Sequence, residues 1–159
     1  MLVALTTSYA QTPSETSPVT AAADYPVAQR TGRAEPLYAI QVKAVRNFYN
    51  RYGDGNNESW YATDYGFRAK FQHDGISFMA DYNKKGGWIL TIKTYGENKL
   101  PKDIRERIRR TYYDQHIFLV QEIDQRNEPV YFVNIEDAGS WLTLRLAGDD
   151  METVAEYEK

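Results

Sequence analysis

The sequence predicts an α+β fold in which two tandem helix-plus-antiparallel-strand repeats form one sheet with both helices on one face. Three observations lead to this prediction. Apolar residues recur at helical spacing in two segments, apolar and polar residues alternate in the segments that follow each of them, and turn residues separate the alternating segments. The chain has 159 residues, which suits one shared hydrophobic core.

The first helix is predicted from Leu37 to Tyr52, because apolar residues in this segment recur every three or four positions. A run of Gly, Asp and Asn at 53–57 ends it. Strands are then predicted near Trp60 and at Phe67–Gln72, Ile76–Tyr82 and Trp88–Tyr95.

A second helix is predicted to begin at Leu100-Pro101, since proline in the first helical turn gives up only an N–H that would have no partner there. Its apolar stripe is Ile104, Ile108 and Tyr112. Strands are predicted after it at Ile117–Ile123, Val130–Glu136, Trp141–Leu146 and Met151–Tyr157.

The two halves match each other at a constant offset of 64 residues. This offset places Ile40 on Ile104, Ala44 on Ile108, Phe71 on Ile135 and Ala80 on Leu144. The matched positions are those expected to face a common core. We therefore interpret residues 37–159 as one domain made of repeat 1 (37–98) and repeat 2 (99–159).

The N-terminal segment has the composition of an export signal followed by a tether. Residues 1–10 are apolar and end with small residues at Ser8 and Ala10, as in the last part of a signal peptide. Residues 11–36 are rich in Ser, Thr, Pro and Ala, which predicts a disordered tether. No stretch approaches the roughly 18 apolar residues of a membrane span. The predicted location is periplasmic or secreted.

Composition argues against most catalytic chemistry. The chain has no cysteine and only two histidines, His73 and His116, which are predicted to lie in a hairpin turn and at a helix end. No nucleophile–base pairing and no metal-ligand spacing is recognisable. We therefore expect no catalytic residues, no metal site, no cofactor and no enzymatic activity.

The charge distribution also gives no reason to expect nucleic acid as a partner. The formal net charge is -3. The arginine-rich second helix has acids four residues before bases, with Asp103 before Arg107 and Glu106 before Arg110, which indicates a solvated, salt-bridged helix face.

The sheet face without helices is the predicted site of partner binding. Side chains expected to point away from the helices include the aromatic, Met and Arg residues that interface centres favour. The candidate contact residues are Arg68, Lys70, Met79, Tyr95, Phe132, Trp141 and Arg145. Cross-strand pairing on an ordinary solvated face explains these residues equally well.

The pattern of the ordered segment resembles the exported PepSY-like proteins of Bacteroidetes-type bacteria. The resemblance lies in Trp60, the strand Phe67–Phe71, the Leu100-Pro101 helix start, the strand around Tyr131 and the final run Leu144–Gly148. It covers about Leu37 to Tyr157. It implies a periplasmic or secreted protein similar in fold to the β-lactamase inhibitor protein, and by analogy of fold it implies inhibition of a protein.

The leading functional hypothesis is a non-enzymatic exported binding module that inhibits or chaperones a protein or peptide in the cell envelope through its open sheet face. One alternative is a small-molecule-binding or enzymatic domain with a pocket between helices and sheet, which requires polar residues on the inward side. A second alternative is a purely structural envelope protein. The sequence does not determine the oligomeric state.

Overall fold

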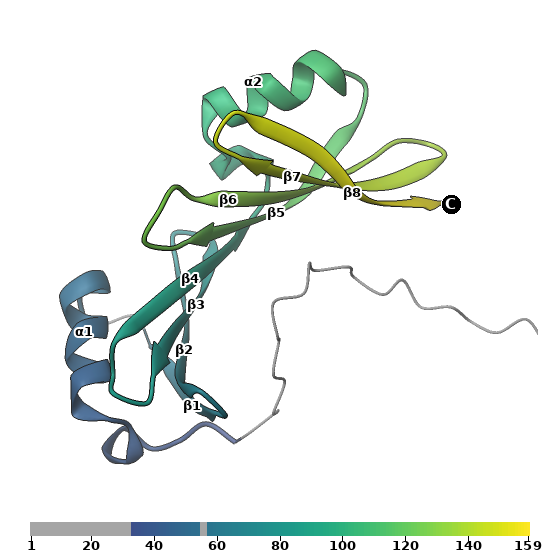
Figure 1. The fold of residues 1–159 in the computed structure, drawn as a ribbon. Coiled ribbons are helices and arrows are strands. Elements are labelled where there is room, and N and C mark those ends of the chain that lie inside the picture. Colours follow the sequence, from purple (N-terminus) through teal and green to yellow (C-terminus); the bar gives the residue numbers. More distant parts are fainter. Residues whose placement is uncertain (1–32, 55–56) are drawn as a thin grey trace, which may run out of the picture.

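The computed structural model describes residues 33–54 and 57–159. The predicted signal peptide at 1–10 and most of the predicted tether at 11–36 lie outside the described residues, so this division of the chain remains a prediction. The described residues form one eight-stranded antiparallel sheet whose strands lie in the order in which they occur in the sequence (Figure 1). The strands are β1 Ser59–Thr63, β2 Gly66–His73, β3 Ile76–Asn83, β4 Trp88–Tyr95, β5 His116–Asp124, β6 Val130–Glu136, β7 Ser140–Ala147 and β8 Asp150–Glu158.

Two short helices pack against this sheet. The helix α1 spans Val42–Tyr52 and α2 spans Lys102–Thr111, and each is preceded by a 3-10 turn, η1 at Leu37–Ala39 and η2 at Glu97–Lys99. The helix α1 begins later than predicted because Gln41 caps it, its side-chain Oε1 accepting a hydrogen bond of 2.7 Å from the Lys43 backbone N–H.

The prediction of an α+β fold made of two tandem helix-plus-strand repeats is wrong. The structure is dominated by a single sheet that continues through the expected repeat boundary, where Thr91–Tyr95 of β4 pair with Val120–Asp124 of β5. The helices have only 11 and 10 residues. The 64-residue match reflects a shared pattern of burial, and amphipathic segments share such a pattern whether or not they form separate units.

Two apolar clusters lie between the helices and the sheet. Under α1, Phe48 is fully buried and packs with Trp60, Phe71 and Tyr82. Under α2, Ile108 is fully buried in a cluster contributed mainly by β5, β6 and β7. The members of the second cluster are Tyr95, Leu100, Ile104, Ile108, Ile117, Val120, Tyr131, Val133, Ile135, Leu142, Leu144 and Leu146.

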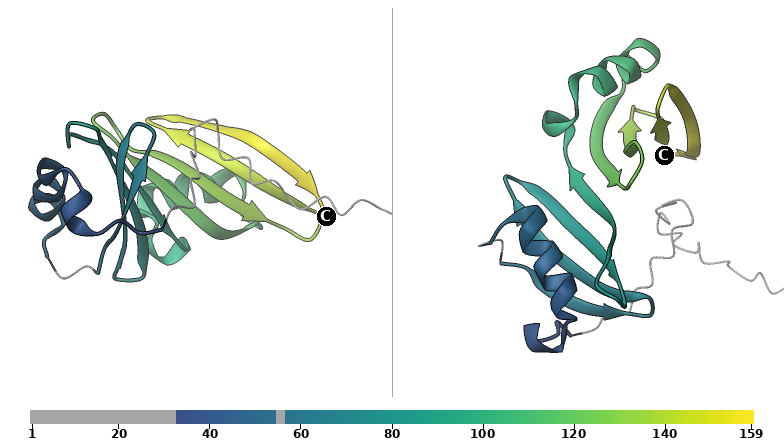
Figure 2. Two further views of the ribbon diagram at one scale, coloured as in Figure 1. Left: turned by 90° about the horizontal axis from the view of Figure 1, so that it is seen from below. Right: turned by 60° about the vertical axis from the view of Figure 1, so that its left-hand side comes forward.

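The sheet is twisted and bent, and both helices lie on its outer side (Figure 2). The cross-strand register defines the opposite surface, which we call the open face. One row of side chains on this face crosses six strands in succession. This row is Lys70, Met79, Ile92, Ile123, Val130 and Ala147.

Candidate functional site

The centre of the open face is apolar. Ile123, Val130 and Phe132 are buried there, and they pack with the partly buried Leu90 and Ile92. Because the first three side chains are already buried, the apolar surface that a partner could cover at this place is that of the partly buried Leu90 and Ile92. The accessible part of this face lies over β2, β3 and β4, where Lys70 is exposed.

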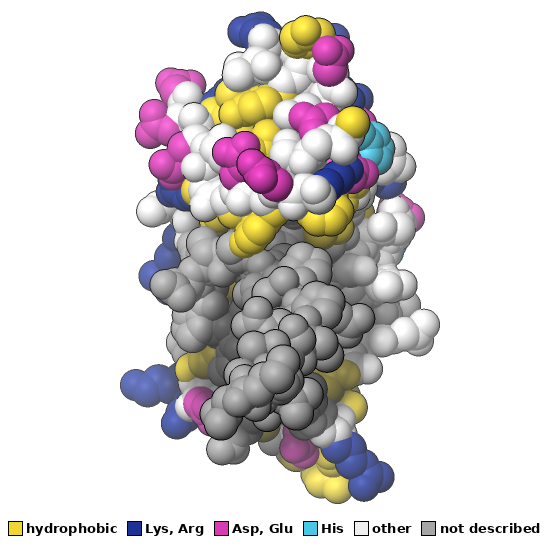
Figure 3. All heavy atoms as spheres, turned by 90° about the vertical axis from the view of Figure 1, so that its right-hand side faces the viewer, with side chains coloured by type: hydrophobic (Ala, Val, Ile, Leu, Met, Phe, Trp, Pro, Cys, Tyr) yellow, Lys and Arg dark blue, Asp and Glu magenta, His cyan; other side chains and the backbone are white. Residues whose placement is uncertain are grey.

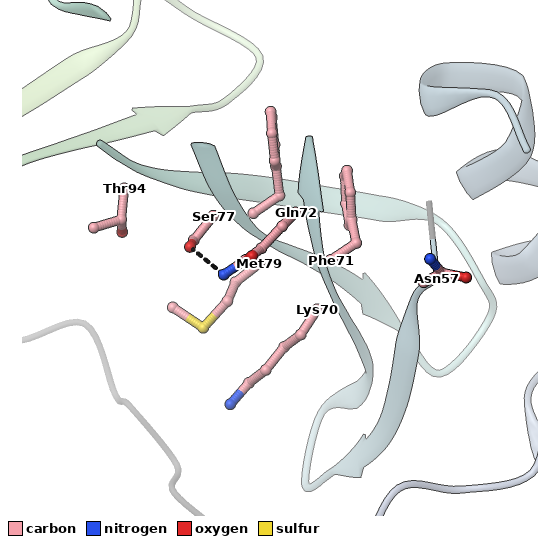
Figure 4. Close-up of a pocket in the computed structure, with 8 residues that line it drawn as sticks. Asn57, Lys70, Phe71, Gln72, Ser77, Met79 and Thr94 are labelled. Carbon is pink, nitrogen blue, oxygen red and sulfur yellow. Dashed lines mark hydrogen bonds between the residues drawn. The ribbon is translucent and has the colours of Figure 1, made fainter. Parts of the chain in front are cut away.

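A shallow groove of about 610 Å³ lies at this part of the sheet. Lys70 and Met79 line it from neighbouring strands on the open face, whereas Phe71, which also lines it, points to the other side of the sheet (Figure 4). The groove therefore takes lining atoms from both faces. The Gln72 side chain donates a hydrogen bond of 3.3 Å to the Ser77 hydroxyl in the groove wall. The groove residues are Asn57, Lys70, Phe71, Gln72, Ser77, Phe78, Met79 and Thr94.

The groove offers a cation next to soft apolar surface. The Lys70 ammonium lies 5.1 Å from the centre of the Tyr61 ring, which orients the side chain without neutralising its charge. Met79 is opposite both Lys70 on β2 and Ile92 on β4. A flexible thioether can adapt to different apolar surfaces, so this pair suits contact with a protein or peptide.

Arg68 is on the open face but has its own partner. Its side chain is buried and donates two hydrogen bonds to Asp81, 2.6 Å from Nε to Oδ1 and 2.8 Å from Nη2 to Oδ2. The Tyr65 hydroxyl donates to Asp81 Oδ2 at 2.8 Å. Hydrogen bonding to Asp81 raises the pKa of the Arg68 guanidinium, and burial raises the pKa of Tyr65. Arg68 therefore stabilises the β2–β3 pair.

Phe132 and Arg145 are direct cross-strand neighbours on β6 and β7. Phe132 is only 5% exposed and belongs to the apolar cluster of the open face. The Arg145 side chain donates a hydrogen bond of 2.8 Å to Glu152 on β8. Arg145 is thus partly neutralised.

Trp141 lies at the far corner of the open face. Its indole N–H donates a hydrogen bond of 2.9 Å to Glu136, and the Lys159 ammonium is 5.2 Å from its ring centre. Lys159 also donates a hydrogen bond of 2.9 Å to Glu136, and the hydrogen bonds from Lys159 and Trp141 lower the pKa of Glu136. This corner is separated from the groove by the width of the sheet, so the structure does not bring Trp141 together with Lys70 and Met79.

Tyr95 does not lie on the open face, which corrects its predicted orientation. It is 5% exposed in the cluster under α2, and its hydroxyl donates a hydrogen bond of 2.6 Å to Glu122. Burial, and after it this hydrogen bond, raises the pKa of Tyr95. The prediction failed because it took the apolar residues of β4 to face the helices. Leu90 and Ile92 instead point to the open face, so Tyr95, on the other side of the strand, faces the helices.

The helix side of β4 and β5 carries a polar cluster that the sequence analysis missed. The Lys93 ammonium lies 2.7 Å from a Glu122 carboxylate oxygen and 3.8 Å from one of Asp124. Cross-strand register joins these residues, since Lys93 is opposite Glu122 and Thr91 is opposite Asp124. The sequence signal for this cluster was the presence of Thr91, Lys93 and Tyr95 at alternate positions of β4, which places them on one side of the strand. Because these charges pair with one another, the cluster links the two strands.

The two histidines are exposed and lie on different hairpins. His73 is 3.6 Å from Asp74, and His116 is 3.7 Å from Glu136. Within residues 33–54 and 57–159, no group of three or more His, Cys, Asp and Glu residues is arranged to hold a metal ion. None of the helices in the described part of the chain is long and apolar enough to cross a membrane.

Comparison with known proteins shows similarity at the level of structure. No protein-family model matches the chain, and no curated protein matches its sequence. A BLIP-like protein from Bacteroides fragilis is 17% identical with a TM-score of 0.60, over 80% of this chain and 89% of that one. A DUF2874 family protein from Bacteroides ovatus is 14% identical with a TM-score of 0.59, over 77% of this chain and 90% of that one.

A third similar structure is a candidate periplasmic protein from Bacteroides eggerthii. It is 10% identical with a TM-score of 0.58, and the match covers 80% of this chain and 90% of that one. At these identities the likeness concerns the fold alone. The chain therefore shares the fold of the BLIP-like and DUF2874 proteins of Bacteroides.

Proposed function

We propose that this chain is a non-enzymatic, exported binding protein that captures a protein or peptide in the cell envelope on the groove of its open face. Lys70 and Met79 are the central contacts, with Ile92 and Thr94 beside them. Inhibition or chaperoning of that partner is the proposed consequence.

One observation carries the proposal. The groove contains a cation with no carboxylate partner among the described residues, Lys70, and next to it lie the partly buried Met79 and Ile92. The other positive groups predicted for this face are engaged, Arg68 with Asp81 and Arg145 with Glu152. An accessible charge beside adaptable apolar surface is the combination that protein interfaces use.

The similar structures support this proposal at the level of fold. One is named BLIP-like, which agrees with the resemblance to the β-lactamase inhibitor protein seen in the sequence. Another is described as a candidate periplasmic protein, which supports a periplasmic or secreted location. Assignment to the PepSY-like exported proteins, and the partial signal peptide at 1–10, are part of the same proposal.

Site-specific photo-crosslinking tests the proposal. A photoreactive amino acid in place of Ser77 or Thr94, which line the groove beside Lys70, is expected to crosslink to a partner protein in the full chain expressed in its own host. The same amino acid in place of Lys102 is the matched control, because Lys102 is a highly exposed lysine on α2, on the opposite side of the sheet. Adding Met79→Asp should remove the crosslink from position 94.

Residues at the groove are better test positions than Phe132. Because Phe132 is 5% exposed, replacing it with a polar residue would disturb the apolar cluster as well as any contact. Equal crosslinking from the two groove positions and from position 102, or crosslinking from position 102 alone, would contradict the proposal. No crosslinks from the open face would favour a purely structural envelope protein.

A further inference from the structure

The last strand of the sheet has a long outer edge. β8 has nine residues and, within residues 33–54 and 57–159, pairs with β7 alone. The opposite edge strand, β1, has only five residues and is partly covered, because the Glu35 backbone N–H donates a hydrogen bond of 2.7 Å to the Trp60 carbonyl. Of the two edges, β8 is the one that can accept another strand.

The backbone of β8 has hydrogen-bonding groups to offer. In a strand paired on one side, alternate N–H and C=O groups point outward. Among the described residues, no backbone group of 151–156 has a backbone hydrogen bond outside the β7–β8 ladder. Arg107 of α2 reaches only the start of the strand, where its guanidinium donates to the Gly148 and Asp150 carbonyls.

The side chains of this edge are acidic. Asp150, Glu152, Glu156 and Glu158 are all exposed, and within the described part of the chain only Glu152 has an ion-pair partner. Acidic side chains gather on the upper part of the molecular face in Figure 3, where β7 and β8 lie. The nearest cation in the sequence, Lys159, is held by Glu136 at 2.9 Å. The edge is therefore complementary to a positively charged segment.

The same charges disfavour pairing between two copies of this chain. A second β8 beside the first would bring another set of four carboxylates to within one strand spacing, about 4.8 Å. Like charges on neighbouring strands destabilise the pair. Val154, which is 41% exposed and has no cross-strand partner at the β7–β8 bulge, gives the edge one apolar contact point for a partner.

We propose that β8 is a strand-addition site for an extended basic segment of another protein, which continues the sheet as a ninth strand. Main-chain hydrogen bonds to β8 provide the affinity, and Lys or Arg side chains of the segment pair with the β8 carboxylates. This site lies on the edge of the sheet and is separate from the groove of the open face.

Peptide binding to the whole chain tests this inference. The probe is a seven-residue peptide of alternating Lys and Val with blocked ends. Its controls are the same peptide with all internal amides N-methylated, which keeps the charge but removes the donors, and a peptide with Glu in place of Lys. We expect only the unmodified basic peptide to bind in titration calorimetry at low salt and to slow hydrogen exchange at the amides of 151–156.

Charge reversal on the protein gives the matched comparison. Glu156→Lys with Glu158→Lys should weaken binding of the basic peptide by about tenfold or more. Glu106→Lys with Glu128→Lys changes the net charge equally at exposed positions outside β8 and should leave binding within about twofold. Equal binding of the N-methylated peptide, or protection outside β8, would overturn the proposal. So would dimerisation through β8 without peptide binding.

Discussion

Arg68 on β2 and Asp81 on β3 lie directly opposite each other, and the guanidinium of Arg68 holds both carboxylate oxygens of Asp81, at 2.6 and 2.8 Å. Both side chains are at most 10% exposed. A buried pair with this geometry is strongly coupled, because the loss of one partner leaves the other charge without compensation. It fixes the register of β2 and β3, which form one wall of the groove.

This pair predicts an asymmetry between single and double substitutions. Arg68→Met alone should lower the free energy of unfolding by about 3–5 kcal/mol, because Asp81 keeps a buried charge. Arg68→Met combined with Asp81→Leu should restore most of this loss, since no charge then remains. Urea denaturation of both variants measures the difference. If the double variant were as unstable as the single one, the pair would not be the cause.

Two glycines with similar backbone angles predict different costs for an added methyl group. Gly75 and Gly86 have φ values of 74° and 75°, but a Cβ on Gly75 would meet nothing within 4 Å. A Cβ on Gly86 would lie 2.6 Å from the Ala44 backbone nitrogen in α1. Gly75→Ala should cost about 1–2 kcal/mol from left-handed backbone strain. Gly86→Ala should cost clearly more, because α1 must also move.

Thermal unfolding of the Gly75→Ala and Gly86→Ala variants distinguishes the cost of backbone strain, which both variants share, from the cost of the contact with α1, which only Gly86→Ala has. Equal shifts in the two midpoints would show that α1 is not held against the β3–β4 turn. That arrangement is supported independently by the Asn47 side chain, which donates a hydrogen bond of 2.7 Å to the Gly86 carbonyl.

Isoleucine truncations compare the cluster under α2 with the surface. Ile108 is 0% exposed and Ile89 is 38% exposed, and replacement by Ala removes the same atoms from each. Ile108→Ala should lower the free energy of unfolding by about 2–5 kcal/mol, because it leaves a cavity. Ile89→Ala should cost no more than about 1 kcal/mol. Similar losses in denaturant titrations would contradict the assigned core.

The corner around Trp141 predicts a pH dependence on the acid side. Hydrogen bonds lower the pKa of Glu136, chiefly from Lys159, and that of Asp137, chiefly from the Gly139 backbone. A carboxyl group whose pKa is lower in the folded state stabilises the fold above its unfolded pKa. That stability is lost as the pH falls through the lower, folded pKa, so the effect appears below about pH 4.5.

NMR titration of the Glu136 carboxyl tests this cause directly. Lys159→Ala should raise its pKa towards the ordinary value, and Trp141→Phe should raise it less, because the indole donor is the smaller contribution. Glu136→Gln should make the acid limb of the stability curve less steep. An unchanged Glu136 pKa after Lys159→Ala would show that this ion pair does not form in solution.

The sequence predicted most element positions because local patterns specify them. Alternation located the strands, and the turn residues before Gly75 and Gly86 marked two of the hairpins. It did not predict that the sheet would dominate the fold, because burial patterns do not reveal which strands pair. The orientation of Tyr95 failed for a related reason: β4 is apolar towards the open face, which is unusual for a side that carries no helix.

The candidate site was predictable only in part. Lys70 and Met79 share the groove as the alternation implied, whereas Arg68 and Arg145 were expected to be available and are paired. Their acidic partners lie on adjacent strands, so only the register shows them. The cluster of Lys93, Glu122 and Asp124 was missed for the same reason.

The strand order has a consequence for how the molecule is made. Because each of the eight described strands pairs only with the strands next to it in the sequence, no pairing among them has to wait for a distant part of the chain. The longest connection between paired strands is the one that contains α2, between β4 and β5. Chains dominated by such local contacts close small loops and fold quickly for their size. The sheet can thus grow hairpin by hairpin, in the direction of synthesis, with each new strand laid on a finished neighbour.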